Sequence, residues 1–254
     1  MTVFPATATG ATATTCSVSG CIHSYETLGA VDGPGLRFVL FVQGCTLRCR
    51  YCHNPDSWAI NDGTRVTVDD ISREVLKYRN YYGSSGGLTV SGGEPLLQLD
   101  FLTELFEQMQ KNHISTAIDT SGAVYRATDK RYDRLLSLTN LVLLDIKHID
   151  TEACRRLTGH GNEETLAFAE RLAADRIPVW IRQVLVPGYT DDKATLRATR
   201  QWIDHLPNAE KVEILPYHTL GRAKYEKLGL DYPLGDLPVP TAESIQTAKK
   251  ILIG

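Results

Sequence analysis

The chain has 254 residues, 43% of them hydrophobic and 22% charged, with a formal net charge of -3, which is typical of a soluble globular protein. It has no apolar run near the ~18 residues of a membrane span and no secretory signal at its start, so we expect a cytoplasmic protein without a membrane partner. The 27 basic and 30 acidic residues are nearly balanced, which argues against a nucleic-acid partner.

The first twenty residues are rich in Thr, Ala, Ser and Gly and carry no charge. This composition predicts a disordered extension over residues 1–20. We expect a single domain to follow over residues 21–254.

Strand-like and helix-like segments alternate along that domain. The predicted strands cover residues 37–42, 88–91, 115–119, 141–147, 178–186 and 211–215. The predicted helices begin after Thr67 and cover residues 101–111, 131–138, a stretch around Ala153, 165–175, 193–206 and 241–251. The apolar strands predict an α/β protein with a parallel sheet, either open and doubly wound or closed into a partial barrel. In both arrangements the chemistry lies at the carboxyl ends of the strands.

Three of the six cysteines form a CxxxCxxC cluster of Cys45, Cys49 and Cys52. A chain this long needs no disulfides to fold, and thiols this close together in the cytosol favour metal binding. A structural zinc site would need a fourth ligand. The nearby candidate is His53, but it directly follows Cys52, and adjacent residues rarely bind the same ion. Three thiolates without a fourth suit a [4Fe-4S] cluster with one open iron.

Other polar residues lie at or near the carboxyl ends of the predicted strands. They are the loop from Ser91 to Pro95, the segment from Asp119 to Gly122, Asp145 to Lys147, Arg182 before Pro187-Gly188, and Pro216 to His218. Because the carboxyl ends of parallel strands share one edge, we expect these segments to gather there.

The cysteine motif and the Gly92-Gly93-Glu94 loop resemble the radical S-adenosylmethionine (SAM) superfamily. More narrowly, the sequence is similar to the pyruvate formate-lyase activating enzymes from about Cys21 to the C-terminus. That similarity lies in the segments 31–37, 43–45, 51–54, 144–147, 179–182 and 215–218. The resemblance implies a (β/α)6 partial barrel.

The resemblance also implies the function. One [4Fe-4S] cluster per chain would bind SAM and cleave it reductively, giving a 5'-deoxyadenosyl radical that takes a hydrogen from a backbone glycine of pyruvate formate-lyase in anaerobic glucose metabolism. A flavodoxin or ferredoxin would supply the electron, and the chain would be a monomer.

The resemblance assigns roles to individual residues. Cys45, Cys49 and Cys52 would ligate the cluster; Asp32 and Arg182 would face the glycine loop of the partner. The SAM contacts would be Tyr51, Cys52, His53, Gly92, Gly93, Glu94, Asp145, Ile146, Lys147 and His218. A monovalent cation, Na⁺ or K⁺, would be bound by Asp119, Thr120, Asp145 and the carbonyl of Leu143.

Some features depart from the family or leave alternatives open. No cysteine lies between His53 and Gly92, where activases of several other glycyl radical enzymes carry a ferredoxin-like insert. Activases of anaerobic ribonucleotide reductase remain an alternative, and so does a non-catalytic zinc or iron-sulfur module. Cys16, Cys21 and Cys154 match no family ligand, and we predict that Cys154 is a helix residue and that Cys16 and Cys21 are incidental thiols.

Overall fold

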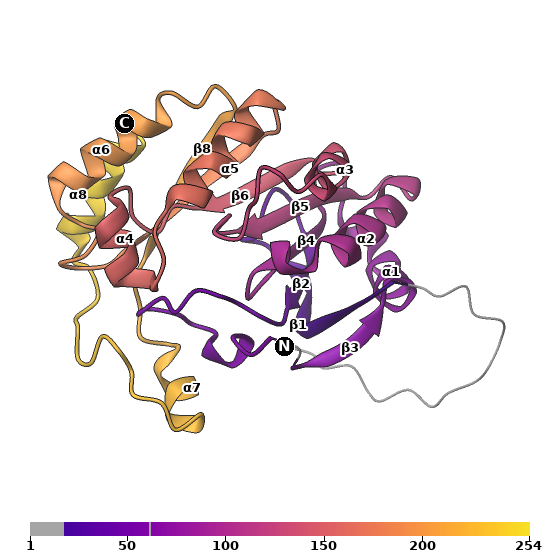
Figure 1. Ribbon diagram of the computed structural model, residues 1–254, viewed down its shortest axis with the longest axis horizontal. Coiled ribbons are helices and arrows are strands. Elements are labelled where there is room, and N and C mark those ends of the chain that lie inside the picture. The colour runs from indigo at the N-terminus through magenta and orange to yellow at the C-terminus, as the bar shows by residue number, and fades with distance from the viewer. Residues whose placement is uncertain (1–17, 61) are drawn as a thin grey trace. The chain divides into compact units, whose positions relative to one another are not determined.

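The computed structural model describes residues 18–60 and 62–254 (Figure 1). In this part of the chain eight strands follow the order β3-β1-β2-β4-β5-β6-β7-β8. The strands are β1 Ser19–Gly29, β2 Arg37–Val42, β3 Thr64–Thr67, β4 Gly87–Gly92, β5 Ser115–Thr120, β6 Leu141–Asp145, β7 Val179–Leu185 and β8 Ala209–Pro216. The α-helices are α1 Val68–Lys77, α2 Leu99–Lys111, α3 Arg131–Ser137, α4 Thr151–Thr158, α5 Glu163–Ala174, α6 Lys193–Ile203, α7 Arg222–Lys227 and α8 Ala242–Leu252. The predicted α/β class is confirmed.

The chain forms two compact units where we expected one domain over residues 21–254. The first holds the described residues up to Cys45 together with Ala59–Thr120 and Thr128–Val142. The second holds Thr46–Trp58, Ser121–Ala127 and Leu143–Gly254. Strand β6 therefore begins in the first unit and ends in the second.

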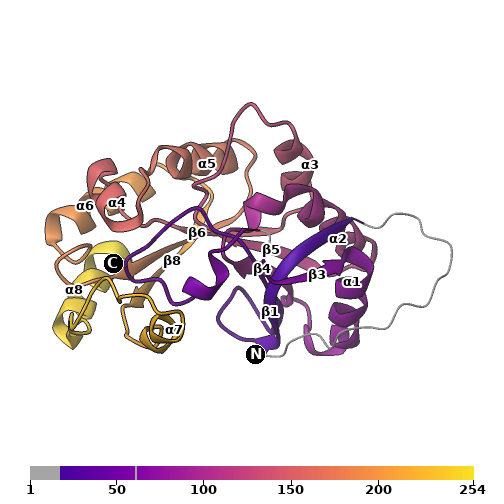
Figure 2. The same ribbon diagram turned by 60° about the horizontal axis from the view of Figure 1, so that its bottom comes forward.

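The first unit is built on strands β1 to β5. Strand β2 pairs in parallel with β4, which pairs in parallel with β5. Phe38, Val39 and Leu40 of β2 are fully buried, as expected for a central strand. Helix α2 packs against both α1 and α3, and Figure 2 shows these three helices together beside β4 and β5.

Two strands of this unit were not predicted. Strand β1 pairs antiparallel with both β2 and β3, so the sheet is not wholly parallel. Buried and partly exposed residues alternate along much of β1, which gives it a weaker apolar signal than a strand buried on both faces.

The start of β1 also corrects the predicted N-terminal boundary. Residues 1–17 of the expected extension lie outside the described part of the chain. Ser19 and Gly20, however, pair with Thr67 and Val66 of β3, so the prediction of disorder was wrong for these two residues.

The second unit is built on the end of β6 and on β7 and β8, which pair in parallel. Helices α6 and α8 pack together, and their Leu196 and Leu252 bury Leu185 of β7. Helix α7 was not predicted, because its six residues are mostly charged and only Tyr225 is buried. No helix of the described residues is long and apolar enough to cross a membrane.

Candidate active site

The predicted site residues are divided between the two units. The first unit contains Asp32, Cys45, Gly92, Gly93, Glu94, Asp119 and Thr120, and the second contains Cys49, Tyr51, Cys52, His53, Leu143, Asp145, Ile146, Lys147, Arg182 and His218. Each half is described by itself.

The loop after β4 is held against the chain that leaves β2. The Gly93 N–H donates to the carbonyl of Val42 at 2.9 Å, and the Glu94 N–H donates to the carbonyl of Gly44 at 2.8 Å. Gly92 has a φ of 115°, and a Cβ there would lie 2.4 Å from the Val42 nitrogen. Glycine is therefore required at position 92 by the neighbouring strand, whatever it also does for a cofactor.

Polar side chains at the carboxyl ends of β4 and β5 bond to one another. Glu94 is almost fully buried and accepts hydrogen bonds from the Leu96 N–H at 3.1 Å and from the Thr120 hydroxyl. The Ser91 hydroxyl donates to an Asp119 carboxylate oxygen at 2.8 Å. Side chains at or just after the ends of two neighbouring strands thus meet at one edge, as the sequence predicted for this half.

Asp32 lies at the other end of these strands, in the turn before β2. Its carbonyl accepts the Thr89 hydroxyl at 2.6 Å, and the same hydroxyl oxygen accepts the Arg37 Nε–H at 2.6 Å. The structure therefore does not bring Asp32 to the edge where Gly92 lies.

The sequence did not predict that the guanidinium of Arg37 forms a buried hydrogen-bond network. It is fully buried and also donates to carbonyls of Pro34, Ser85, Leu88 and Ser115 at 2.7–3.3 Å. Burial lowers its pKa to about 10. Because its loss would remove hydrogen bonds to four backbone carbonyls and to the Thr89 hydroxyl, this side chain fixes the turn that contains Asp32.

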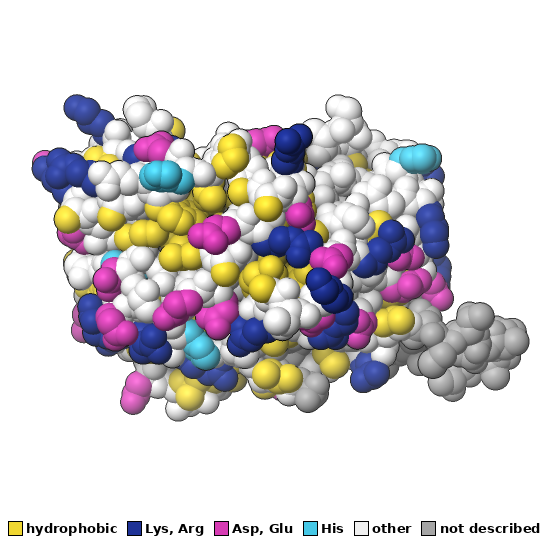
Figure 3. All heavy atoms as spheres, turned by 45° about the horizontal axis from the view of Figure 1, so that its top comes forward, with side chains coloured by type: hydrophobic (Ala, Val, Ile, Leu, Met, Phe, Trp, Pro, Cys, Tyr) yellow, Lys and Arg dark blue, Asp and Glu magenta, His cyan; other side chains and the backbone are white. Residues whose placement is uncertain are grey.

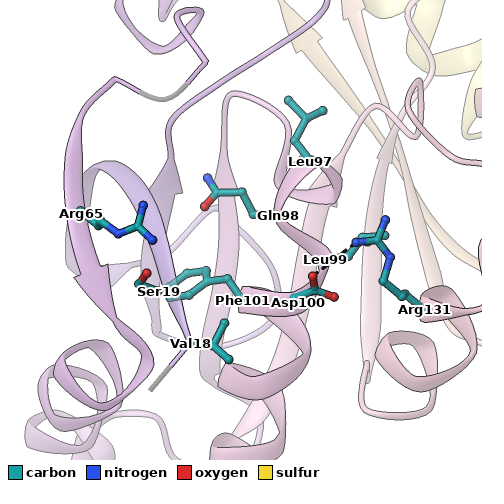
Figure 4. A pocket seen from close by; sticks show the side chains of 9 residues that line it. All are labelled: Val18, Ser19, Arg65, Leu97, Gln98, Leu99, Asp100, Phe101 and Arg131. Atoms are coloured by element: carbon teal, nitrogen blue, oxygen red, sulfur yellow. Dashed lines mark hydrogen bonds and ion pairs between the residues drawn. The ribbon is translucent and has the colours of Figure 1, made fainter. Parts of the chain in front are cut away.

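Gln98 supports the chain that enters the cysteine loop, a role that no sequence motif indicated. Its Nε2 donates to the carbonyls of Cys21 and Gln43 at 2.8 and 3.0 Å, and its Oε1 accepts the Cys21 N–H at 2.8 Å. Gln98 also lines a cavity of about 440 Å³, with Arg65 on one side and Arg131 on the other (Figure 4).

In the second unit the cysteine loop is anchored on the end of α4. The N–H of Arg48 donates to the carbonyl of Thr158 at 2.7 Å, and the N–H of Arg50 donates to the carbonyl of Leu157 at 3.0 Å. The last carbonyls of a helix have no partner within it, so α4 offers them to the loop.

The sulfur of Cys52 sits in a local turn. The Cys52 N–H donates to the Cys49 carbonyl at 3.0 Å, and the Asn54 N–H points to the Cys52 Sγ at 3.4 Å. Burial raises the pKa of Cys52, while the Asn54 N–H and the Trp58 side chain act in the opposite direction. Cys49 is also buried.

Asp145 and Lys147 form an ion pair next to this loop. Their carboxylate and ammonium groups are 2.8 Å apart, and both side chains are mostly buried. Burial acts to lower the pKa of Lys147, but Asp145, Tyr51 and Cys49 together outweigh it and hold that pKa well above the usual value. The ammonium also lies 5.9 Å from the centre of the Tyr51 ring.

The remaining backbone of this strand end is tied to β7. The N–H of Ile146 donates to the carbonyl of Arg182 at 2.8 Å, and Leu143 is fully buried. Strand β6 ends at Asp145, so Lys147 belongs to the loop that follows.

Three aromatic residues of this half carry buried polar atoms without a hydrogen-bond partner. They are the hydroxyls of Tyr51 and Tyr225 and the Nδ1 of His218. Burial raises the pKa of Tyr51 well above its usual value, so the hydroxyl stays protonated. Such atoms are costly unless a ligand or water pairs with them, so the Tyr51 hydroxyl and the His218 Nδ1 are candidates to bind a polar ligand.

Arg182 has an acidic neighbour that the sequence analysis did not single out. Its Nε lies 3.2 Å from a carboxylate oxygen of Glu213, directly opposite on β8. The Lys211 ammonium reaches the other oxygen of Glu213 at 2.7 Å.

Within residues 18–60 and 62–254, no group of three or more His, Cys, Asp or Glu side chains is arranged to hold a metal ion. The cluster and cation ligands therefore stay predictions from the sequence motifs.

Comparison with known proteins decides the family. A family model described as "Radical SAM superfamily" matches residues 39–198. Pyruvate formate-lyase-activating enzymes of Staphylococcus aureus strains USA300 and NCTC 8325 are 50% identical over 236 residues, covering 91% of this chain and 94% of theirs. The chain belongs to the radical SAM superfamily, among the pyruvate formate-lyase-activating enzymes.

Solved structures agree with this radical SAM assignment. A domain of a pyruvate formate-lyase-activating enzyme from Bacteroides vulgatus matches with a TM-score of 0.55 at 26% identity, covering 66% of this chain and 93% of that one. Coproporphyrinogen III oxidase from Escherichia coli, a radical SAM enzyme, matches with a TM-score of 0.55 at 15% identity, covering 84% and 50%. The second match shows the fold alone, and the predicted radical SAM partial-barrel fold is confirmed.

Radical SAM membership implies a [4Fe-4S] cluster and SAM, and the second unit fits both. The N–H of Asn54 directed at the Cys52 sulfur suits a thiolate ligand, because N–H groups stabilise charged sulfur. The unpaired Tyr51 hydroxyl and His218 Nδ1 suit a polar cofactor such as SAM.

Acidic and basic side chains are interspersed on the face in Figure 3, in keeping with the nearly balanced charge of the sequence.

Proposed function

We propose that this chain activates pyruvate formate-lyase under anaerobic conditions, by reductive cleavage of SAM that leads to a glycyl radical on the partner. The observation that carries the proposal is the 50% identity to activating enzymes over nearly their whole length. The cysteine motif and the Gly92–Glu94 loop lie inside the region matched by the radical SAM family model.

When bound, the cluster supplies the electron that breaks the sulfonium C–S bond of SAM and so yields the radical that takes the glycine hydrogen. In this proposal Cys45, Cys49 and Cys52 ligate the cluster, and the Asn54 N–H stabilises the thiolate of Cys52. The cysteine loop keeps its conformation because the end of α4 holds its backbone.

The ion pair of Asp145 and Lys147 suits the charged methionine end of SAM, because it offers one group of each sign. The Tyr51 hydroxyl and the His218 Nδ1 are two buried polar atoms with capacity for a further hydrogen bond. Gly92 and Gly93 would bring backbone close to the same ligand.

The glycine loop of the partner would meet Arg182, which Glu213 orients. Asp32, in the turn before β2, stays a prediction from the family motif. A flavodoxin or ferredoxin as electron donor, a monovalent cation at Asp119, Thr120, Leu143 and Asp145, and a monomeric cytoplasmic enzyme complete the proposal.

The test is SAM cleavage by the anaerobically reconstituted, dithionite-reduced protein. We expect equal amounts of 5'-deoxyadenosine and methionine. Cys49→Ala should lose the iron and the cleavage, whereas Cys21→Ala, outside the motif, should retain both. Binding of zinc alone, or an iron-sulfur spectrum without cleavage, would overturn the proposal in favour of a non-catalytic module.

A further inference from the structure

Lys224 of α7 reaches the segment that follows the third cysteine. Its Nζ lies 2.8 Å from the Asn54 Oδ1, and 3.1 and 3.0 Å from the two carboxylate oxygens of Asp56. All three residues belong to the second unit. Helix α7 packs against the short helical turn at Pro55–Ser57, and Figures 1 and 2 both show the two side by side.

Asn54 is held on three sides. Its side-chain Oδ1 accepts a hydrogen bond from the Lys224 ammonium, and its backbone carbonyl accepts one from the Ser57 hydroxyl at 2.7 Å. Its own N–H points to the sulfur of Cys52 at 3.4 Å. Lys224 therefore fixes the residue that supplies an N–H to a predicted cluster ligand.

The start of α7 approaches the cysteine loop closely. A Cβ on Gly221 would lie 2.8 Å from the Cα of His53 and 3.0 Å from the carbonyl oxygen of Cys52. Further along, Tyr225 packs edge-on against Trp58, with ring centres 5.8 Å apart. These contacts place the charge of Lys224 beside the loop and keep it there.

N–H groups directed at cluster sulfurs, and positive charge near a cluster, favour its reduced and more negative state, and so raise its potential. Asp56 opposes the charge of Lys224 in part. We propose that Lys224 is a positioning residue that sets the reduction potential of the cluster, by holding the Asn54 N–H on the Cys52 sulfur and by placing a positive charge beside the loop. The inference rests on the proposed function, since it requires that the cysteines hold a cluster.

The experiment is an anaerobic redox titration of the reconstituted protein, with the reduced cluster followed by electron paramagnetic resonance. In Lys224→Met we expect the ratio of reduced to oxidised cluster at a fixed ambient potential to fall about tenfold, which is ~59 mV for a one-electron couple. Lys224→Arg, which keeps the charge, should remain near the unmodified protein. Lys227→Met on the same helix is the matched control, because Lys227 is exposed and its loss removes the same charge.

Equal potentials in Lys224→Met and the unmodified protein would overturn the inference, and so would an equal shift in Lys227→Met. If Lys224→Met fails to bind iron, the reduction potential of Lys224→Gln is measured instead. This variant keeps hydrogen-bond donors but lacks the charge. A potential below that of the unmodified protein then supports the inference, and an unchanged one refutes it. Failure of the unmodified protein to hold a cluster or cleave SAM would instead refute the proposed function.

Discussion

The imidazole rings of His53 and His218 stack with their centres 3.9 Å apart and their planes 21° apart. The Nε2 of His53 also lies 3.2 Å from the carbonyl oxygen of His218. Burial, and then the neighbouring His218, lower the pKa of His53, so this ring is neutral at pH 7. The pair joins the segment after the third cysteine to the segment after β8.

Gly221 allows this close approach, and Gly221→Ala should separate the two segments. The new Cβ would lie 2.8 Å from the His53 backbone, a distance that requires one segment to move. We expect at least a ~10-fold loss of SAM cleavage, because a displacement of about 1 Å near reacting groups costs about 100-fold in rate. The measurement is 5'-deoxyadenosine formation per mole of bound iron.

Gly161→Ala is the control for this variant. A Cβ there meets only the carboxyl end of the exposed Glu163 side chain, which can move away. Its SAM cleavage should equal that of the unmodified protein. Equal activity in the Gly221 and Gly161 variants would show that the close approach is not needed.

Arg37→Met should destabilise the first unit strongly. The substitution leaves four backbone carbonyls and the Thr89 hydroxyl without the guanidinium. Breaking a buried network of this kind costs about 3 kcal/mol or more in the free energy of unfolding. Urea denaturation of the iron-free protein measures this cost, with Arg73→Met, whose side chain is 72% exposed, as the control. A cost below about 1 kcal/mol for Arg37→Met would contradict the structural role.

Gly92→Ala tests whether the glycine after β4 serves the fold as well as a cofactor. Its φ of 115° and the 2.4 Å approach to the Val42 nitrogen predict a loss of at least ~2 kcal/mol in the unfolding free energy of the iron-free protein. Gly83→Ala separates the effect of the positive φ from the effect of the steric clash. Gly83 also has a positive φ, but a new Cβ there would have no atom within 4 Å. It should cost about 1 kcal/mol. An iron-free Gly92→Ala protein as stable as the original would mean that this glycine serves only ligand binding.

Asp192 predicts a pH dependence of stability. It caps α6 by accepting the N–H groups of Ala194 and Thr195 at 3.1 and 2.9 Å. Hydrogen bonds from Thr195 lower the pKa of this carboxyl below its ordinary value. Its contribution is therefore present above the unfolded-state pKa of about 3.9 and is lost as pH falls through the lower folded-state pKa.

Asp192→Ala should accordingly cost about 1 kcal/mol in the free energy of unfolding at pH 7, and less at pH 3. Urea denaturation at both pH values gives the two differences. A difference that stays constant or grows at pH 3 would show that the charge of Asp192 does not stabilise the cap.

The sequence predicted the elements whose own residues determine them. The apolar run at residues 37–42 predicted the bounds of β2, Arg37–Val42, correctly. Helix α1 begins after Thr67 as predicted, because Thr67 is its N-cap and forms a capping box with Asp70. Helix α4, which buries Cys154, was also anticipated.

What the sequence did not predict depends on partners far along the chain. Strand β1 exists because β2 and β3 pair with it on both sides. The roles of Gln98 and Lys224 depend on residues 55–77 and 168–170 positions away. Short motifs carry no information about such distant contacts, so the cysteine loop could be found from sequence but its supports could not.

The central claim is that this chain places a radical on pyruvate formate-lyase. Its most direct test is electron paramagnetic resonance of pyruvate formate-lyase after anaerobic incubation with the reconstituted protein, SAM and a reductant. We predict a glycyl radical signal that disappears when Cys49→Ala replaces the unmodified protein. Cleavage of SAM without any glycyl signal on pyruvate formate-lyase would contradict the account and indicate a different glycyl radical enzyme as the partner.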